Sequence, residues 1–545
     1  MIQINQLKLP VDHSENDLKR KILKILRIKE DALLSYRIKK QSLDARKKPE
    51  LFYVYSVNVN VRNESAVKKK VRGGQISFGI RESSYEFPVT GNQFLKHRPV
   101  VIGTGPAGLF CGYMLALSGY RPILLERGAD VTKRMEDVER FWNGGTLDPN
   151  SNVQFGEGGA GTFSDGKLNT LVNDKLGRNT KVLEIFVEHG APEEILYQSK
   201  PHIGTDILAS VVKNMRDFIC SHGGEVRFHS QVIDIQTSIV DQEKTLCALK
   251  VLDHETNETY LLNTDTAVLA IGHSARDTFA MLEHRNIKME AKAFAVGVRI
   301  EHPQSMINED QYGTGYPDSL PAAPYKLTAN LENGRGVYTF CMCPGGYVVN
   351  ASSEEGRLAV NGMSYSRRDG ENANSAVIVT VTPEDYGKEH ALSGMEFQRR
   401  LEEAAYKAGQ GKIPVQLFGD FCRNQSSHGP GSICPNLKGG YNWSNVRQIF
   451  PDEIAESLEE GIRSFNRKIP GYSRDDAVLS GVESRTSSPV RILRNESLQS
   501  CVGGLYPCGE GAGYAGGITS AAMDGLKVAE MIAKKYHPFD KRSDA

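Results

Sequence analysis

The amino-acid sequence predicts an α/β protein made of several domains. Three observations carry this prediction: a buried strand that enters a glycine-rich turn and a helix within residues 98–128, strand-like runs between residues 225 and 264, and a strand-rich segment at 291–440. The length of 545 residues allows about two to four domains of roughly 100–200 residues each. We expect their bounds at 1–95, 96–290, 291–440 and 441–545, with the second and fourth segments folding as one unit.

The first 60 residues have the pattern strand, helix, strand, strand. Residues 2–9 alternate apolar and polar side chains, and residues 14–17 form a capping-box sequence before apolar residues at helical spacing. Residues 33–40 and 51–61 are rich in strand-forming residues, and the second run has a period of two. We therefore expect a small α/β unit of ferredoxin-like type, followed by a linker or hairpin over residues 62–98.

Charge is balanced over the whole chain but not along it. The sequence has 66 basic and 66 acidic side chains, whereas residues 1–98 carry 21 basic against 10 acidic ones, a surplus of 11. The basic run 68–72 allows two interpretations, a solvated surface or a contact with an anion such as RNA. Charged residues at 24% and apolar ones at 39% are typical of a globular protein and argue against a disordered or fibrous chain.

We expect neither secretion nor a membrane span. Residues 1–10 lack the apolar stretch of a signal peptide, and the uncharged residues 99–120 contain five glycines and Pro106. Nine cysteines, an odd number, suit a reducing cytoplasm better than a disulfide framework, so we expect a cytoplasmic protein. Cys341 and Cys343 match no common zinc or redox spacing, and we interpret them as two side chains on a strand. No metal site is expected.

The most informative segment is 98–128. A strand runs into the sequence Gly103-x-Gly105-x-x-Gly108, a helix follows, and a second strand ends at Glu126. In such a βαβ unit the first glycine makes the tight turn, the second lets a pyrophosphate approach the backbone, and the third lets the helix pack on the strand. The positive end of the helix stabilises the phosphates, and the terminal acid can accept hydrogen bonds from ribose hydroxyls. The segment therefore predicts a dinucleotide site.

Two later segments complete this unit. Residues 265–272 form an apolar strand that closes at Gly272, after a predicted β-meander over residues 225–264. Residues 504–510 form a short strand that ends in Gly509-Glu510 and leads through a glycine-rich turn into a helix that begins near Ile518.

With these segments the sequence resembles the two-dinucleotide-binding-domain flavoproteins of the glutathione-reductase-like superfamily. Residues 99–535 resemble more specifically the uncharacterised FAD-dependent dehydrogenase family of bacteria and plastids. The runs that carry the resemblance are GTGPAGLFCGYMLALSGYRPILLERG, GGAGTFSDGKL, PHIGTD, AIGHSARDTF, GVESRTSSPVRI and GLYPCGEGAGYAGGITSAAMDG. The resemblance implies a Rossmann-like FAD-binding domain, with FAD as the cofactor.

The resemblance also implies which residues contact FAD. The glycine-rich turn would bind the pyrophosphate, Glu126 the adenosine ribose, and Val232 the adenine through its backbone, with Arg127 and Arg134 near the adenosine and pyrophosphate. Residues 159–167 and the helix N-terminus at 517–518 would lie against the isoalloxazine, where backbone N–H groups can stabilise the negative charge of reduced flavin. Glu510 stands where many relatives have Asp. The predicted cofactor-binding residues are Gly103, Gly105, Pro106, Ala107, Gly108, Glu126, Arg127, Arg134, Gly159, Ala160, Gly161, Thr162, Ser164, Lys167, Val232, Ala270, Gly272, Gly509, Glu510, Gly516, Gly517 and Ile518.

Residues 291–440 interrupt the flavin unit. Their strand patterns predict an antiparallel β-rich domain with a hairpin at Pro344-Gly345-Gly346, which would cover the open face of the flavin and select the substrate. The segment contains no second strand–glycine–helix unit, so NAD(P)H would bind transiently over the flavin or another carrier would supply electrons. The loop at 159–167 contains no cysteine, whereas the matching loop of disulfide reductases holds a redox pair, so we do not expect disulfide reduction.

No single residue can be assigned as the catalytic group from the sequence. Residues 485–488 with Arg491 form a cluster of donors that suits an anionic substrate, although a polar turn before Pro489 would have the same composition. His273, directly after a strand, is either a proton donor or a residue at a helix start. Further proton-transfer candidates by location are Glu483, Tyr347 and Tyr514. The named catalytic candidates are Glu483, Arg485 and His273.

These observations lead to three hypotheses of function. The first is an FAD-dependent oxidoreductase that transfers a hydride between a small, anionic or unsaturated substrate and the flavin N5, with NAD(P)H as a candidate second redox partner. The alternative from another class is a flavoprotein that modifies or binds RNA through its basic N-terminal domain. The third is a non-catalytic scaffold stabilised by bound flavin. The sequence leaves the substrate, the direction of electron transfer and the oligomeric state open.

Overall fold

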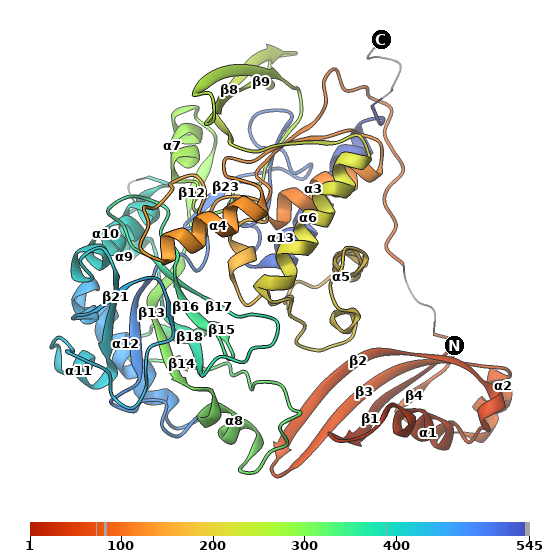
Figure 1. Ribbon diagram of the computed structural model, residues 1–545. Helices are drawn as coiled ribbons and strands as arrows, with labels where there is room; N and C mark the ends of the chain where they lie inside the picture. The colour runs from red at the N-terminus through yellow and green to blue at the C-terminus, as the bar shows by residue number, and fades with distance from the viewer. Residues whose placement is uncertain (72, 81–83, 389, 540–545) are drawn as a thin grey trace.

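The computed structural model describes residues 1–71, 73–80, 84–388 and 390–539 (Figure 1). The N-terminal sheet lies at one end of the molecule, shown in red. The parallel sheet and its helices occupy a second region, and the strands of the inserted segment, in green to blue, form a third. No helix within these ranges is both long enough and apolar enough to cross a membrane.

The N-terminal unit is a four-stranded antiparallel sheet with two helices. Its elements are β1 (Ile2–Pro10), α1 (Glu15–Leu26), β2 (Leu33–Lys47), β3 (Glu50–Val61), α2 (Glu64–Lys70) and β4 (Ile76–Ser77). The strand order β2-β3-β1-β4 with the element order βαββαβ is that of a ferredoxin-like fold.

The linker or hairpin expected over residues 62–98 is corrected in part, because α2 and β4 lie there. The Asn63 side chain accepts a hydrogen bond from the backbone N–H of Ala66, which caps α2. Val67 packs in the core of the unit, whereas Lys68, Lys69 and Lys70 are exposed in the last turn. The single apolar position per turn made this short helix difficult to recognise. Position 72 of the basic run is outside the described residues.

The second unit is built on a five-stranded parallel sheet in the order β24-β11-β5-β6-β7. The strands are β5 (Val100–Ile102), β6 (Ile123–Leu125), β7 (Glu225–Arg227), β11 (Ala267–Leu269) and β24 (Leu505–Pro507). Alternate strand residues face opposite sides, so Val101 packs with the helices and Val100 with the meander side. The three long helices of the first side are α3 (Pro106–Leu117), α6 (Thr205–Ser221) and α13 (Ile518–Lys535).

The predicted meander is present with one change. It consists of β8 (Ser230–Val240), β9 (Glu243–Asp253) and β10 (Glu258–Asn263), paired antiparallel. The first predicted strand is split, because residues 225–227 join the parallel sheet as β7 before the chain turns into β8. The remaining helices and strands of this unit are α4 (Val131–Trp142), α5 (Arg178–Glu188), α7 (Arg276–His284), β12 (Met289–Ala291) and β23 (Val490–Ile492).

The inserted segment forms a seven-stranded sheet in the order β14-β15-β18-β13-β22-β19-β21. Its strands are β13 (Phe294–Pro303), β14 (Thr328–Asn330), β15 (Gly336–Cys343), β18 (Asn372–Val381), β19 (Ile413–Leu417), β21 (Tyr441–Trp443) and β22 (Val478–Glu483). Neighbouring strands are antiparallel apart from the β19–β21 pair. The sheet continues past residue 440, since β21 and β22 belong to it. The helices are α8 (Gln304–Tyr312), α9 (Pro383–Tyr386), α10 (Ser393–Ala408), α11 (Phe418–Arg423) and α12 (Asp452–Phe465).

The hairpin predicted at Pro344–Gly346 is wrong. Residue 343 ends β15 in the large sheet, whereas the chain after Gly346 enters β16 (Tyr347–Asn350), which pairs with β17 (Val360–Met363) and β20 (Leu437–Lys438) in a separate three-stranded sheet. The Gly346 N–H donates to the carbonyl of Asn372, and the carbonyl of Gly345 accepts from Gly370. These distant partners replace the cross-strand pairing that the local turn sequence indicated.

Candidate functional site

The glycine-rich turn between β5 and α3 contains three glycines. The packing of the protein leaves no room for a side chain at two of them, whereas it leaves room at the third. Gly103 has φ +96°, and a Cβ there would lie 2.5 Å from the Ala270 carbonyl oxygen. A Cβ on Gly108 would lie 1.9 Å from the Gly103 oxygen. By contrast, a Cβ on Gly105 would meet only Gly159 Cα, at 3.8 Å. The protein itself tolerates a side chain at Gly105, so the space there is open to a ligand.

Three glycine-rich segments meet at the carboxyl ends of the parallel strands. A Cβ on Gly159 would lie 2.9 Å from Gly105 Cα, one on Gly161 would lie 3.0 Å from Ile518 Cγ1, and one on Gly509 would lie 2.6 Å from Ala107 Cβ. This edge is where ligands bind in open α/β sheets. The predicted residues with nothing within 4 Å of an added Cβ are Gly272, Gly516 and Gly517.

Glu126, directly after β6, accepts hydrogen bonds both from this turn and from the loop that follows it. Its carboxylate is 5% exposed and accepts from both the N–H (2.9 Å) and the hydroxyl (2.7 Å) of Thr104. The other oxygen accepts from the N–H groups of Gly128 and Gly156, each at 3.0 Å. A carboxylate has about four acceptor positions, so a ribose hydroxyl would share Glu126 with these donors or replace the rotatable Thr104 hydroxyl.

The two predicted arginines hold protein groups. Arg134 is fully buried and donates to main-chain carbonyls at Asn152, Val153, Gly156, Glu157 and Gly159. Burial lowers its pKa to about 10. Arg127 donates to Asp277 at 2.8 Å and lies over the Phe155 ring. In this structure Arg134 therefore shapes the loop that leads to Gly159, and a contact of either arginine with a cofactor stays a prediction.

The remaining predicted cofactor residues lie around the same edge. Pro106 is the first residue of α3, and Ala160 begins a 3-10 turn, Ala160–Phe163. The Thr162 hydroxyl is buried without a hydrogen-bond partner among the described residues, and the Ser164 hydroxyl donates to Gly161. Val232 is a core residue of β8, a strand whose first residue, Ser230, donates its N–H to the Glu126 carbonyl.

The catalytic candidates His273 and Glu483 are each held by a charged side chain. His273 Nδ1 lies 3.1 Å from a carboxylate oxygen of Glu510, which joins the ends of β11 and β24. Its Nε2 is buried without a partner within the described part of the chain. Glu483 ends β22 and accepts from the buried Arg299 at 2.8 Å, and burial raises the pKa of its carboxyl.

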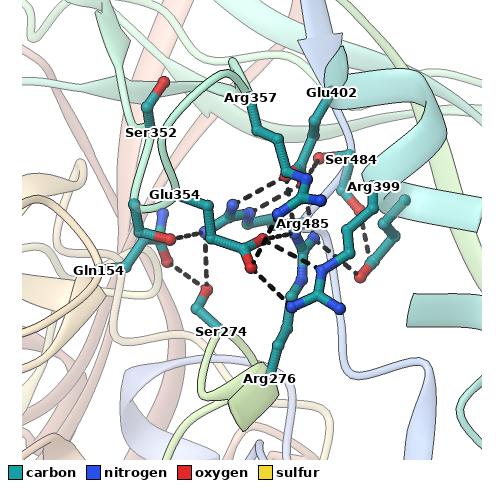
Figure 2. A network of polar contacts seen from close by, with 12 residues as sticks. Gln154, Ser274, Arg276, Ser352, Glu354, Arg357, Arg399, Glu402, Ser484 and Arg485 are labelled. Carbon is teal, nitrogen blue, oxygen red and sulfur yellow. Dashed lines mark hydrogen bonds and ion pairs between the residues drawn. The ribbon is translucent and has the colours of Figure 1, made fainter. Parts of the chain in front are cut away.

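The third candidate, Arg485, belongs to a buried network that Figure 2 shows. Arg485 and Arg276 both point to Glu402, and each makes two hydrogen bonds to its carboxylate, at 2.7–3.0 Å. Arg485 Nη1 also donates to the hydroxyls of Ser274 and Ser353. A substrate anion at Arg485 would have to displace this internal carboxylate, so its catalytic role stays a prediction.

The other members of the predicted donor cluster form a polar turn. The Thr486 hydroxyl donates to the Ala295 carbonyl, and the Ser488 hydroxyl contacts the carbonyls of Val490 and Gly511. Arg491 lies beside the Tyr514 ring, and the Tyr514 hydroxyl donates to a backbone carbonyl. Tyr347, the remaining candidate, lies beneath the Lys438 ammonium.

A group of cations beside residues 159–167 was missed by the sequence. The Arg368 guanidinium makes two hydrogen bonds to the buried carboxylate of Asp165, and Lys167 Nζ lies 3.7 Å from the same group. Desolvation lowers the pKa of Lys200, and the charges of Lys167 and Arg368 lower it further. Two cations thus share one carboxylate, and Lys200 lies near both of them. No local pattern could reveal the group, because Arg368 is 203 residues from Asp165.

Comparison with known proteins defines the class. Residues 293–486 match the family model "FAD-dependent protein, C-terminal domain-like", and residues 1–60 match a domain of unknown function, DUF8436. Together with the glycine-rich βαβ unit, the first match supports an FAD-dependent flavoprotein of the oxidoreductase kind. An uncharacterized protein of Clostridium beijerinckii is 49% identical over 98% of this chain and 99% of its own length. The chain belongs to the same family as that protein.

Solved flavoproteins are more distant. The glycerol-3-phosphate dehydrogenase of Bacillus halodurans, complexed with FAD, is 11% identical over 82% of this chain and 65% of its own, with a TM-score of 0.36. A flavoprotein/dehydrogenase of Cytophaga hutchinsonii is 10% identical over 80% and 76%, with a TM-score of 0.33. These scores are too low to transfer any residue role, and the specific glutathione-reductase-like relationship stays a prediction.

Proposed function

We propose that this protein is an FAD-dependent oxidoreductase that transfers a hydride between a small, anionic or unsaturated substrate and the flavin N5. The observation that carries the proposal is the meeting of Gly105, Gly159–Gly161 and Gly517–Ile518 at the carboxyl edge of the parallel sheet. Bound FAD would supply the hydride chemistry, and NAD(P)H or another carrier would complete the cycle.

The residues at this edge suit a dinucleotide and a flavin ring. The N-terminus of α3 presents backbone N–H groups and a positive dipole end to the space beside Gly105, which favours a pyrophosphate. The N-terminus of α13 does the same at Gly517, whose φ of +148° few other residues adopt. Both helices begin at the same edge, so one extended ligand can contact both.

The cation group supports an anionic substrate better than the donor cluster at Arg485. Lys167 ends the loop at 159–167, Arg368 pairs with Asp165 of that loop, and Lys200 lies near both cations, so together they carry more positive charge than Asp165 neutralises. Arg368 is bound to Asp165 much as Arg485 is bound to Glu402, so the attraction for an anion rests on Lys167 and Lys200. A carboxylate or phosphate substrate would therefore be attracted to the Lys167 side of the site.

His273 is the residue that the geometry favours for proton transfer. Its Nε2 has no partner among the described residues, while Nδ1 is oriented by Glu510. A ring held at one nitrogen can donate or accept a proton at the other. Glu483 is less suited, because its carboxylate is bound to Arg299.

The proposal is tested by anaerobic titration of the reconstituted protein. FAD is added to the purified chain, unbound flavin is removed, and absorbance is followed during addition of NADH, NADPH and a panel of small carboxylates and phosphates. We expect a stoichiometric flavin complex that at least one compound reduces within seconds. A chain that retains no flavin contradicts the proposal, and a flavin that no compound reduces supports the scaffold hypothesis instead.

RNA binding is the second candidate, and one observation favours it. Lys68, Lys69 and Lys70 form an exposed basic turn at the end of α2, in the unit that carries the surplus of positive charge. Basic exposed clusters of this kind attract phosphates without reading sequence.

A further inference from the structure

Cys341 and Cys343 lie close together at an irregular end of β15. The pairing of β15 with β18 shifts between Phe340 and Cys343, and Cys341 has φ +42°, in the left-handed region. The Cys343 sulfur lies 3.2 Å from the Cys341 carbonyl oxygen. Both residues are on a strand as the sequence indicates, and the irregular backbone places the Cys343 thiol against residue 341.

Charged groups lie near the pair. Arg299 of β13 is fully buried and places Nη1 2.8 Å from the Cys341 carbonyl and 3.9 Å from the Cys343 sulfur. Lys167 and Asp165 belong to the loop that begins at Gly159, and Glu483 accepts a hydrogen bond from Arg299.

The two thiols differ in charge and in access. The hydrogen bond from Cys343, followed by the charges of Arg299 and Lys167, lowers the pKa of Cys341. Burial, and then the neighbouring Cys341, raises the pKa of Cys343. Cys341 is partly exposed, whereas Cys343 is buried. Cys341 is therefore the more exposed and the more acidic member of the pair, and Cys343 is the buried one.

We propose that Cys341 and Cys343 form a reactive dithiol for low-molecular-weight disulfides, with Cys341 as the attacking sulfur and Cys343 as the resolving sulfur. The Cys341 thiolate attacks one sulfur of the disulfide, its S–S bond breaks, and the first thiolate leaves. Cys343 then gives its proton to that thiolate and attacks Cys341, which releases the second sulfur as a thiolate that takes a proton from water. The protein dithiol loses two electrons to form a disulfide, and the substrate becomes two thiols.

This site is distinct from the redox loop of disulfide reductases, because residues 159–167 contain no cysteine. It is also poorly suited to a metal cation, since Arg299 and Lys167 place positive charge beside the sulfurs. Among the described residues no group of three or more His, Cys, Asp and Glu side chains is placed to hold a metal ion.

The test uses the full-length protein and glutathione disulfide, with peptide mass spectrometry as the readout. We expect the wild-type peptide that contains both cysteines to lose two hydrogens. Cys343→Ser should instead trap glutathione on Cys341, and Cys341→Ser should show neither product. Cys501→Ser, which removes an exposed cysteine elsewhere, should behave as the wild type.

A rate measurement on the unmodified chain keeps the test independent of whether the variants fold. At pH 6, iodoacetamide should label Cys341 at least about tenfold faster than the exposed Cys501, because its neighbours lower the pKa of Cys341. Equal labelling rates, or glutathione found only on other cysteines of Cys343→Ser, would overturn the proposal. Neither measurement requires flavin reduction, so its outcome is separable from that of the proposed oxidoreductase function.

Discussion

At the scale of single residues, Gly105 is a position where a small side chain would affect ligand binding without affecting folding. A Cβ there meets no atom closer than 3.8 Å, and its backbone lies in the extended region that alanine adopts readily. A Cβ on Gly108 would lie 1.9 Å from a carbonyl oxygen, so a substitution there would disturb folding as well as ligand binding.

We therefore predict that Gly105→Ala weakens FAD binding by at least about tenfold, because its methyl group occupies the approach of the pyrophosphate. The unfolding temperature of the flavin-free protein should stay unchanged. Fluorescence titration with FAD measures the affinity. The matched control is Gly429→Ala, at another glycine with open space around it. Unchanged FAD affinity in Gly105→Ala would show that the pyrophosphate lies elsewhere.

Glu301 on β13 is a fully buried acid with one carboxylate oxygen that has no partner among the described residues. Its other oxygen accepts from the Asn372 side chain and the Asn436 N–H. Burial raises the pKa of Glu301 to about 7. The folded state therefore prefers the protonated acid, and the stability this provides is complete below the unfolded pKa near 4.5 and is lost as pH rises through about 7.

The resulting prediction concerns the free energy of unfolding between pH 5 and pH 8. The wild type should lose more stability than Glu301→Gln over this range, by up to about 3 kcal/mol, since each pKa unit corresponds to about 1.36 kcal/mol. Urea denaturation across the range measures the difference. Glu309→Gln, which alters an exposed acid on α8, should follow the wild-type curve. If the free energy of unfolding changed with pH in the same way for the wild type and Glu301→Gln, the raised pKa of Glu301 would be refuted.

At the scale of elements, Glu402 links helices that belong to different parts of the chain. It lies on α10 of the inserted segment and binds Arg276 of α7 in the flavin unit, as well as Arg485 after β22 (Figure 2). Burial alone would raise the pKa of Glu402, but the two guanidiniums lower it. The carboxylate is therefore ionised and binds both guanidiniums. It connects the inserted segment to the flavin unit.

We expect Glu402→Gln to lower the free energy of unfolding by about 3–5 kcal/mol, because the buried Arg485 loses its counter-charge and Arg276 keeps only Glu354. Chemical denaturation at neutral pH checks this. Glu403→Gln, one residue away, removes a partly exposed partner of Arg357 and should cost about 0–1 kcal/mol. A loss of similar size in both variants would mean that the network does not join the units as described.

At the scale of the whole molecule, the net charge of zero conceals a basic N-terminal unit and an acidic remainder. If the second candidate function holds, RNA affinity should fall steeply between about 50 and 200 mM salt. Replacing Lys68, Lys69 and Lys70 with Gln should weaken binding and reduce this salt dependence. Filter binding with single-stranded RNA measures both. Lys527→Gln with Lys534→Gln, at exposed positions on α13, is the control pair. No binding at low salt would end this hypothesis.

The parts of the fold that could be predicted from the sequence are those set by neighbours along the chain. The strand, turn and helix around Gly103 follow from glycine geometry and apolar runs, and the meander follows from successive strand-like runs. The missed helix α2 has too few apolar residues for a local pattern, whereas the hairpin prediction failed because it depended on distant partners. The turn at Pro344–Gly346 connects two sheets because its backbone groups pair with residues 370 and 372, which no local pattern reveals.

The sequence by itself determined that this chain contains a dinucleotide-type βαβ unit and an antiparallel insertion, because both depend on short-range periodicity and on glycines that steric exclusion requires. Only the tertiary structure decided the partners of the charged side chains. Arg485 binds Glu402 83 residues away, and Arg299 on β13 reaches Glu483 at a separation of 184 residues and also lies beside Cys343. Coulombic attraction and desolvation depend on distance and burial in space, and spacing along the chain specifies neither.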